Sequence, residues 1–243
     1  MSLSLRQLTP ARVSLGRTGN SLATSELLEF RLAQARARDA VHVRLDVPSL
    51  RAELREMGLE SLVVASAARD RAEYLRRPDL GRRLDDKSRA SLEALRPAEC
   101  AKTAIVVADG LSAIAVLRHA APLLELVKRE LEAGAEEVGN VIIATQARVA
   151  IGDEIGEALG AELAVILIGE RPGLSAPDSL GVYLTWHPKA GRTDAERNCI
   201  SNIRPEGLSY EAAAFKLLFL IREARRLRLS GVQLKESGGL VAP

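Results

Sequence analysis

Polar residues that could bind a ligand follow directly on three apolar runs of the chain. They lie in residues 109–112, 145–152 and 169–179, and each of these segments contains glycine as well as polar side chains. If the apolar runs are parallel strands, the segments after them meet outside the carboxyl ends of the strands, where open α/β sheets bind ligands. The spacing therefore predicts one pocket lined by all three segments.

Glu170 is the first carboxylate after the longest of these apolar runs. A carboxylate at that place can pair with an arginine such as Arg171, or it can accept hydrogen bonds from a ligand. The pattern is equally compatible with both outcomes. Because a residue at the end of a strand carries little packing, we expect a Glu170→Ala substitution to leave the fold intact.

Ser112 and Cys199 are the two candidate nucleophiles. Ser112 follows Gly110-Leu111, but a nucleophile elbow needs Gly-x-Ser-x-Gly, and position 114 is isoleucine. We therefore favour the role of helix N-cap for Ser112. A lone cysteine such as Cys199 is usually a small buried packing residue. Contact with a ligand is the alternative, and nucleophilic catalysis ranks below both.

Common nucleotide and metal motifs are missing from the sequence. No Gly-x-Gly-x-x-Gly follows an apolar run, and no Gly-x-x-x-x-Gly-Lys-Ser/Thr occurs. His42, His119 and His187 are scattered, without His-x-x-x-His or His-Glu-x-x-His spacing. We therefore expect no metal site and no standard nucleotide fingerprint.

The composition bounds the class of protein. The 243 residues are 47 % apolar but only 3 % aromatic, which favours helices packed on an aliphatic sheet. The 34 basic and 32 acidic residues give a net charge of +2, so no basic excess indicates nucleic-acid binding. No apolar run approaches the roughly 18 residues of a membrane span, and residues 1–9 lack the apolar core of a signal peptide. Two cysteines do not suggest a disulfide framework, and we expect a reducing cytoplasm.

The elements that must position the three polar segments are strands that are apolar on both faces. We predict four such strands, separated by helices, at residues 104–108, 141–144, 163–168 and 181–185. This pattern indicates a mainly parallel sheet covered on both sides. The predicted fold class is α/β, a Rossmann-like doubly wound sheet preceded by a helical, arginine-rich N-terminal region. We divide the chain into residues 1–100 and 101–243; within the first part, only residues 62–64 could form a strand.

Local signals predict where helices begin and end. We expect Thr24 or Ser25 to cap the first long helix and Ser209 to cap the last one. Pro122 is expected to interrupt the helix after the first of the four strands and to open a second helix. Gly160 is placed to end a short helix. The arginine-rich loop at residues 76–83 is expected to be a solvated surface, with a subunit contact as the alternative.

Several segments of the chain match the motifs of one known family, in order and at the family's spacing. They are residues 74–84, 109–112, 148–149 with 155–157, 169–174, 194–203 and 230–234. In these segments the chain resembles the small (light) subunit of adenosylcobalamin-dependent ethanolamine ammonia-lyase. Any one segment would be weak evidence, whereas the whole set is specific.

The resemblance implies a division of labour between two subunits. A large TIM-barrel subunit holds ethanolamine and most of the active site, while the small subunit covers part of adenosylcobalamin at the subunit interface. Radical chemistry at that site yields acetaldehyde and ammonia. The cobalamin contacts of the family fall on Val149, Glu170 and Cys199 of this sequence, and no catalytic residue is assigned to the chain. Asp-x-His-x-x-Gly does not occur, so binding with the lower base on is expected.

Some positions depart from the family. They are residues 21–24, residues 33–34, Ala147 and Trp186. The first two alter the N-terminal region that is expected to dock onto the large subunit. Some family members carry a long N-terminal extension linked to packaging in a bacterial microcompartment. Barely a dozen residues precede the matched block here, so a cytoplasmic location is expected and encapsulation is doubtful.

Two other functions remain open at this point. A free-standing Rossmann-like enzyme that uses a nucleotide would be active as an isolated chain, but the glycine fingerprints are missing. A scaffold protein that has lost cofactor binding would fit the altered N-terminal segments. The presence of Val149, Glu170 and Cys199 counts against the scaffold.

Overall fold

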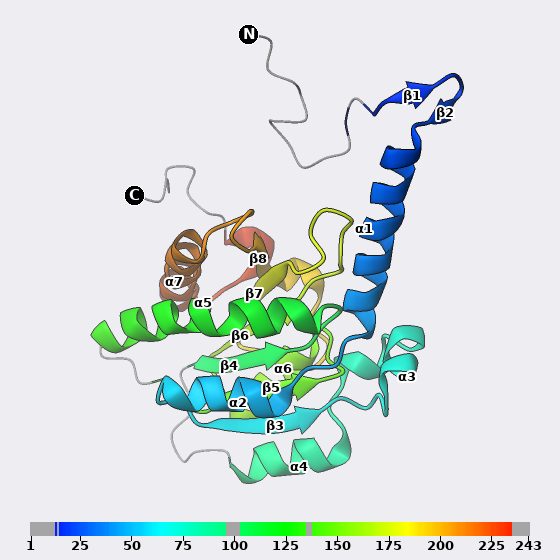
Figure 1. Ribbon diagram of the computed structural model, residues 1–243. Helices are drawn as coiled ribbons and strands as arrows, with labels where there is room; N and C mark the ends of the chain where they lie inside the picture. Colours follow the sequence, from blue (N-terminus) through cyan, green and yellow to red (C-terminus); the bar gives the residue numbers. More distant parts are fainter. Residues whose placement is uncertain (1–12, 14, 96–102, 135–137, 235–243) are drawn as a thin grey trace.

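The centre of the molecule is a six-stranded sheet (Figure 1). The computed structural model describes residue 13 and residues 15–95, 103–134 and 138–234. In their order across the sheet, the strands are β3 (Ser61–Ala65), β5 (Val141–Thr145), β4 (Thr103–Ala108), β6 (Leu163–Gly169), β7 (Leu180–Trp186) and β8 (Arg197–Ile203). β3, β5, β4 and β6 run parallel, β7 runs antiparallel to β6, and β8 runs antiparallel to β7.

The predicted α/β class and mainly parallel sheet are confirmed, with two differences at the far side of the sheet. The four predicted strands are β4, β5, β6 and β7, and the candidate strand in the first hundred residues is β3. β7 is antiparallel because residues 170–179 turn the chain back without the helical crossover that a parallel connection needs. β8 was not predicted, because this edge strand has a neighbour on one side only and carries polar residues.

Helices cover both faces of the sheet. α2 (Val47–Glu56), α5 (Ala113–Ala133) and α7 (Tyr210–Leu227) pack on one face, and α4 (Asp86–Ala94) and α6 (Ile151–Leu159) pack on the other (Figure 1). Each face encloses an aliphatic cluster; we call the one beneath α4 and α6 the α6-side cluster. β6 lies in the middle of the sheet and all of its residues are buried, as expected for a strand that is apolar on both faces.

The predicted interruption at Pro122 is wrong, because α5 runs through this residue without a break. Proline inside a helix removes one hydrogen bond and costs about 3 kcal/mol. The apolar stripe of α5 continues on both sides of Pro122, however, with Val116 and Ala120 before it and Leu123 and Leu124 after it, all buried in the core. Burial of this stripe outweighs the local cost.

Helix caps follow the local signals in three of four places. Ser112 caps α5 and Ser209 caps α7, since each side chain accepts a hydrogen bond from the backbone N–H three residues on. α6 ends at Gly160, which has a left-handed φ of 67°. The prediction for α1 is wrong. Neither Thr24 nor Ser25 caps it, because a short hairpin leads the chain directly into the helix and makes the preceding alanine the N-cap.

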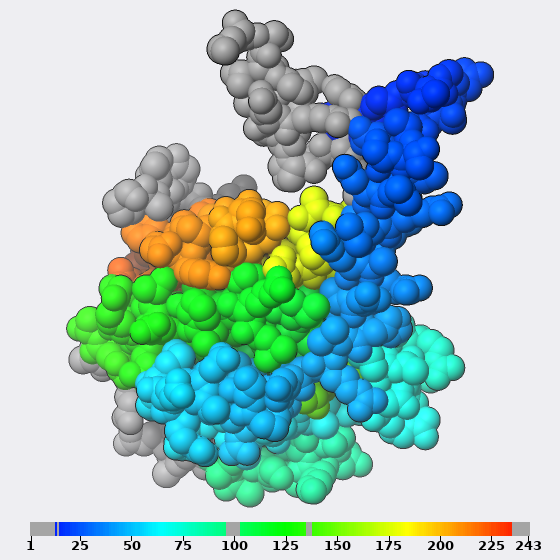
Figure 2. Space-filling view, in the orientation of Figure 1, coloured from blue at the N-terminus to red at the C-terminus, as the bar shows by residue number. Residues whose placement is uncertain are grey.

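α1 (Thr24–His42) projects from the rest of the molecule, with the hairpin of β1 (Arg17–Thr18) and β2 (Ser21–Leu22) at its tip (Figures 1 and 2). Leu28 and Leu32 of this helix are 59 % and 52 % exposed. Apolar side chains on a projecting element are typical of protein–protein contacts. The predicted domain boundary at residue 100 lies outside the described residues. No helix of the described part of the chain is long and apolar enough to cross a membrane.

Candidate functional site

A cavity of about 370 Å³ opens at the carboxyl ends of β4, β5 and β6. Its lining includes Gly110 and Leu111 after β4, Arg148 and Val149 after β5, Gly169, Glu170 and Arg171 at the end of β6, and Tyr74, Ile168 and Tyr183. All three segments predicted to meet here therefore contribute. In Figure 1 the arrowheads of β3 and β4 point to this side of the molecule, where α1 and α3 (Arg71–Arg76) also lie.

Val149 lies in the loop between β5 and α6, and it packs on the edge of the α6-side cluster. The buried carboxylate of Asp109 holds this loop, because it accepts hydrogen bonds from the backbone N–H groups of Gln146 and Ala147, both at 2.9 Å. Burial raises the pKa of Asp109, while these two N–H groups and the guanidinium of Arg71 act in the opposite direction. Asp109 therefore ties the end of β4 to the loop that carries Val149.

Tyr74 also supports the loop between β5 and α6. Its hydroxyl donates a hydrogen bond of 3.1 Å to the carbonyl of Ala147. The backbone N–H of Arg148 donates to the carbonyl of Gly81 at 2.7 Å. A Cβ at position 81 would lie 2.9 Å from the Tyr74 ring, so only glycine allows this approach. Residues 76–83, whose arginines are exposed as predicted, thus include a structural support of the cavity.

Glu170 is the most heavily hydrogen-bonded group of the cavity wall. Its carboxylate accepts from the hydroxyls of Ser179 and Ser201 and from the backbone N–H of Asn202, the last at 3.2 Å. The carboxylate crosses the start of β7 at Gly181, where a Cβ would lie 2.9 Å from Oε1. Glu170 therefore joins the end of β6 to the end of β8.

This network concerns two predictions about Glu170. Among the described residues it makes no ion pair with Arg171 or any other arginine, so the predicted pairing of Glu170 with an arginine is wrong. The expectation that Glu170→Ala leaves the fold intact stays a prediction, but the hydrogen bonds of Glu170 give the substitution a local cost. Asn202, which Glu170 holds, has a left-handed φ of 60°, a conformation that needs local support in a residue other than glycine. An alanine at position 170 would remove the support of this turn.

Cys199 lies next to the cavity but does not line it. In β8 it is the direct partner of Tyr183 on β7, and Tyr183 does line the cavity. Cys199 is exposed, so its predicted role as a buried packing residue is wrong. Partial desolvation and the nearby charge of Glu170 raise the pKa of its thiol. The thiol is therefore neutral at physiological pH and a poor nucleophile.

The other candidate residues have structural roles. Ser112 is fully buried, and its hydroxyl donates to the carbonyl of Pro177 at 2.8 Å, which excludes the alternative role of exposed nucleophile. The Nδ1 atom of His119 is hydrogen-bonded to the hydroxyl of Tyr210 at 2.7 Å. Within the described part of the chain, no group of three or more histidine, cysteine, aspartate or glutamate side chains could hold a metal ion.

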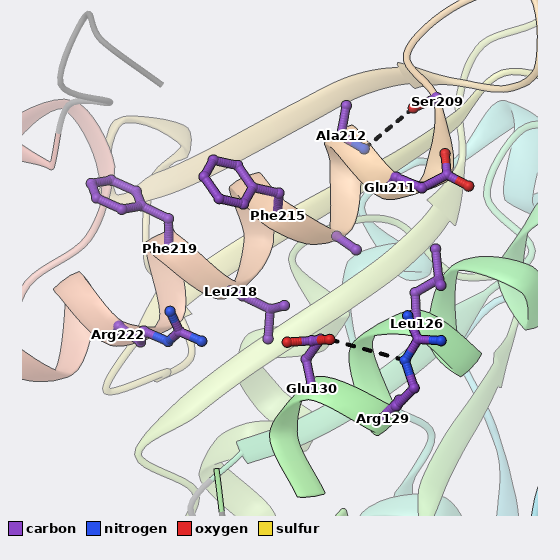
Figure 3. Close-up of a pocket in the computed structure, with 11 residues that line it drawn as sticks. Leu126, Arg129, Glu130, Ser209, Glu211, Ala212, Phe215, Leu218, Phe219 and Arg222 are labelled. Atoms are coloured by element: carbon purple, nitrogen blue, oxygen red, sulfur yellow. Dashed lines mark hydrogen bonds and ion pairs between the residues drawn. The ribbon is translucent and has the colours of Figure 1, made fainter. Parts of the chain in front are cut away.

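A larger hollow of about 470 Å³ lies between α5 and α7, on the outer face of the molecule (Figure 3). Its lining includes the apolar side chains of Leu126 on α5 and of Phe215, Leu218 and Phe219 on α7, together with four charged residues, Arg129, Glu130, Glu211 and Arg222. None of the three polar segments after the strands contributes to it. The cavity at the strand ends therefore remains the candidate site.

Comparison with known proteins places the chain in a family. The family model described as "Ethanolamine ammonia-lyase light chain (EutC)" matches residues 2–235. The chain belongs to this family of ethanolamine ammonia-lyase light chains. The light chain is the small subunit of a carbon–nitrogen lyase.

Individual relatives from several pseudomonads agree with the family match. The chain is 56 % identical over 236 residues to the ethanolamine ammonia-lyase small subunit of Pseudomonas fluorescens Pf0-1, covering 96 % of this chain and 86 % of the relative. It is 54 % identical over 240 residues to that of Pseudomonas syringae pv. tomato DC3000, covering 98 % and 84 %. Against the small subunit of Pseudomonas aeruginosa LESB58 it is 55 % identical over 245 residues, covering 99 % and 89 %.

Sequence reasoning missed the residues that position this light-chain site. Asp109 was noted only as part of a motif, although a carboxylate directly after an apolar strand is a signal for a buried polar anchor. Tyr74 and Tyr183 could have been singled out as rare aromatics in a chain with 3 % of them. No local signal indicates that Ser179, Ser201 and Asn202 converge on one carboxylate.

Proposed function

We propose that this light chain contacts adenosylcobalamin with Val149, Glu170 and Cys199, at the interface with a large subunit that carries the active site for ethanolamine. The observation that carries the proposal is the common cavity. Val149 and Glu170 come from different loops and line the same cavity, and Cys199 pairs with Tyr183, a third part of its wall.

The donors, acceptors and apolar surface of the cavity suit the edge of a corrin ring. Corrin side chains are carboxamides, whose N–H groups need acceptors. A carboxylate has about four lone-pair sites, and Glu170 uses three of them for Ser179, Ser201 and Asn202. One site thus remains for an N–H of the cofactor, while Val149 offers an apolar surface. The neutral thiol of Cys199 adds no charge beside it.

The size of the cavity favours binding of the cofactor by two subunits together over complete enclosure by the light chain. Pockets for drug-sized ligands measure about 300–1,000 Å³, and a corrinoid is much larger than such a ligand. A cavity of about 370 Å³ can therefore cover only one side of the cofactor. The rest of the cofactor would be covered by the large subunit, and the closed interface would exclude water from the reaction.

The chemistry of the reaction belongs to the cofactor and the large subunit. When bound, adenosylcobalamin would supply the radical chemistry that converts ethanolamine to acetaldehyde and ammonia. On this proposal the light chain makes and breaks no bond of the substrate. Its residues hold and orient the cofactor, and they keep that side of the site closed.

We further propose that the N-terminal region, residues 1–100, docks onto the large subunit, and that α1 is the part of this region that makes the contact. The exposed leucines of α1 support this proposal, since they lack cover in the described part of the chain. The end of α1 is also joined to the cavity. The guanidinium of Arg71 donates to the carbonyls of Val41 in α1 and Gly110 in the cavity wall, both at 2.8 Å. Docking at α1 would therefore affect the position of the loops that line the cavity.

The test is reconstitution with a large subunit from the same genome. The two chains are co-expressed, the complex is purified, and acetaldehyde formation from ethanolamine is measured with adenosylcobalamin. We expect activity to require both chains. Acetaldehyde formation by the large subunit alone at the same rate, or a lack of any complex between the chains, would refute the proposal.

A variant of Glu170 tests the site itself. Glu170→Gln keeps the shape and most hydrogen bonds of the side chain but offers fewer acceptor sites to the cofactor. We expect it to weaken cobalamin retention by the complex, measured from the visible absorbance that remains after gel filtration. Glu56→Gln, at an exposed position on α2, is the matched control. Equal retention by both variants would refute the role of Glu170.

A further inference from the structure

The side chain of Arg148 lines the candidate cavity and has no polar partner within the described residues. Its guanidinium carbon lies 4.4 Å from the centre of the Tyr74 ring, a cation–π stack. In the described part of the chain it makes no hydrogen bond and no ion pair. Its Nε is buried without an acceptor, whereas its two terminal amino groups are not shut off from solvent.

Other arginines of this chain that are largely buried have acceptors. Arg71 donates to two backbone carbonyls and lies 3.4 Å from the carboxylate of Asp109. Arg197 pairs with two aspartates, and Arg204 donates to the side chain of Asn202. Each of these guanidinium groups therefore has at least one acceptor, although Nη2 of Arg71 and Nε of Arg197 are buried without one. The Arg148 guanidinium has no acceptor at all among the described residues, and it lines the cavity.

The position of Arg148 is set in advance of any ligand. Its backbone N–H is bonded to Gly81, and a Cβ at position 81 would lie 3.0 Å from its Cγ, so the stem of the side chain is confined there. The Tyr74 ring holds the planar head. A guanidinium that stacks on a ring keeps its N–H donors at the edge of the plane free for acceptors. This arrangement lowers the entropy lost when a ligand binds.

The carboxylate that lines the cavity does not pair with Arg148. Glu170 lines the same cavity, but its oxygens accept from Ser179, Ser201 and Asn202, and no ion pair joins it to Arg148. Arg171, on the rim, adds a second positive charge that has no ion-pair partner among the described residues. The cavity thus presents free donors on the side of Arg148.

We propose that Arg148 binds an oxygen atom of the ligand in this cavity, through the terminal amino groups of its guanidinium. The inference rests on the proposed cobalamin site and adds a residue to it. Glu170 offers an acceptor and Arg148 offers donors, which together match a carboxamide, with its N–H and its carbonyl oxygen. A phosphodiester oxygen of the nucleotide tail of cobalamin has the same acceptor chemistry.

The test uses the complex of both subunits and measures binding rather than activity. Cobalamin affinity is determined by absorbance titration for the wild type, Arg148→Met and Arg148→Lys. Methionine keeps an unbranched stem against Tyr74 without a donor, and lysine keeps the charge without the planar fork. Arg51→Met, at an exposed position on α2, controls for the loss of one positive charge. Elution of each complex on gel filtration shows whether the variant still folds and assembles.

We expect Arg148→Met to weaken cobalamin binding about tenfold to a hundredfold, the range for a lost hydrogen bond to a charged group. Arg148→Lys is expected to recover part of the loss, and Arg51→Met to bind as the wild type does. A second titration with cobinamide, which has the carboxamides but lacks the nucleotide tail, distinguishes the two oxygens. Weaker binding of both corrinoids assigns the contact to a carboxamide, and weaker binding of cobalamin alone assigns it to the phosphodiester.

Unchanged affinity of an assembled Arg148→Met complex for both corrinoids would overturn the role of Arg148. That result differs from a failure of the proposed function, in which the wild-type complex itself would bind no corrinoid. An equal loss of affinity in Arg51→Met would also overturn it, because the effect would then come from net charge and not from the cavity.

Discussion

The carboxylate of Asp109 should contribute strongly to the stability of the loop between β5 and α6, which carries Val149. Asp109→Asn tests this with almost no change in the shape of the side chain. In the wild type, the two carboxylate oxygens accept from two successive backbone N–H groups, those of Gln146 and Ala147, at 2.9 Å each. Asparagine has one oxygen, so its NH2 group must face one of these N–H groups. One buried backbone donor is then left without an acceptor.

The size of the effect follows from these contacts. An unsatisfied buried donor costs about 1–3 kcal/mol, and breaking a buried ion pair costs about 3–5 kcal/mol. Arg71 keeps its bonds to the carbonyls of Val41 and Gly110, which reduces the second cost. Burial also raises the pKa of Asp109, so the charged form is already destabilised in the wild type. We expect a net loss of about 2–4 kcal/mol from the free energy of unfolding.

Urea unfolding of the wild type, Asp109→Asn and Asp79→Asn measures this loss. Asp79 forms an ion pair with Arg77 on the surface, and such pairs contribute little, so its variant should unfold at the wild-type urea concentration. Hydrogen exchange adds a local readout, since the amides of Gln146 and Ala147 should exchange faster in Asp109→Asn. An Asp109→Asn protein with wild-type stability and unchanged exchange at these two amides would refute the reasoning.

Further predictions concern the surrounding structure. Gly169→Ala should lower the free energy of unfolding by about 3 kcal/mol or more, because its Cβ would lie 2.0 Å from the carbonyl oxygen of Ser112; an unchanged thermal midpoint would contradict this. Arg197→Met should cost about 3–5 kcal/mol in urea unfolding by leaving Asp153 buried without its partner, whereas a neutral effect would mean that the pair is dispensable. Burial lowers the pKa of His119, against the opposing effect of Asp178 beside it. Because the unfolded chain takes up this proton first, stability should fall as the pH drops below about 6.5. His119→Gln should reduce that fall in urea titrations at pH 7.5 and 5.5, and identical pH profiles would contradict the assignment.

Local signals in the sequence were sufficient for the elements that depend on neighbouring residues. The strands β4, β5 and β6 are continuous aliphatic runs, and such runs have few other ways to bury both faces. Ser112 and Ser209 cap helices through bonds to residues three positions on, and Gly160 ends α6 through its own φ. Parallel strands then bring their carboxyl ends to one edge, which is why the meeting of the three loops could be predicted.

Properties that depend on distant partners were decided by the tertiary structure. Glu170 accepts from Ser201 and Asn202, which are more than thirty residues away, and Cys199 reaches the cavity wall because β8 pairs with β7. Pro122 stays within a helix because burial of the apolar residues on both sides of it stabilises the helix by more than the lost hydrogen bond costs. Arg148 and Arg197 are equally charged in the sequence. Among the described residues, Arg197 pairs with carboxylates, whereas Arg148 stacks on an aromatic ring without an ion pair, because packing across the sheet edge sets which side chains meet.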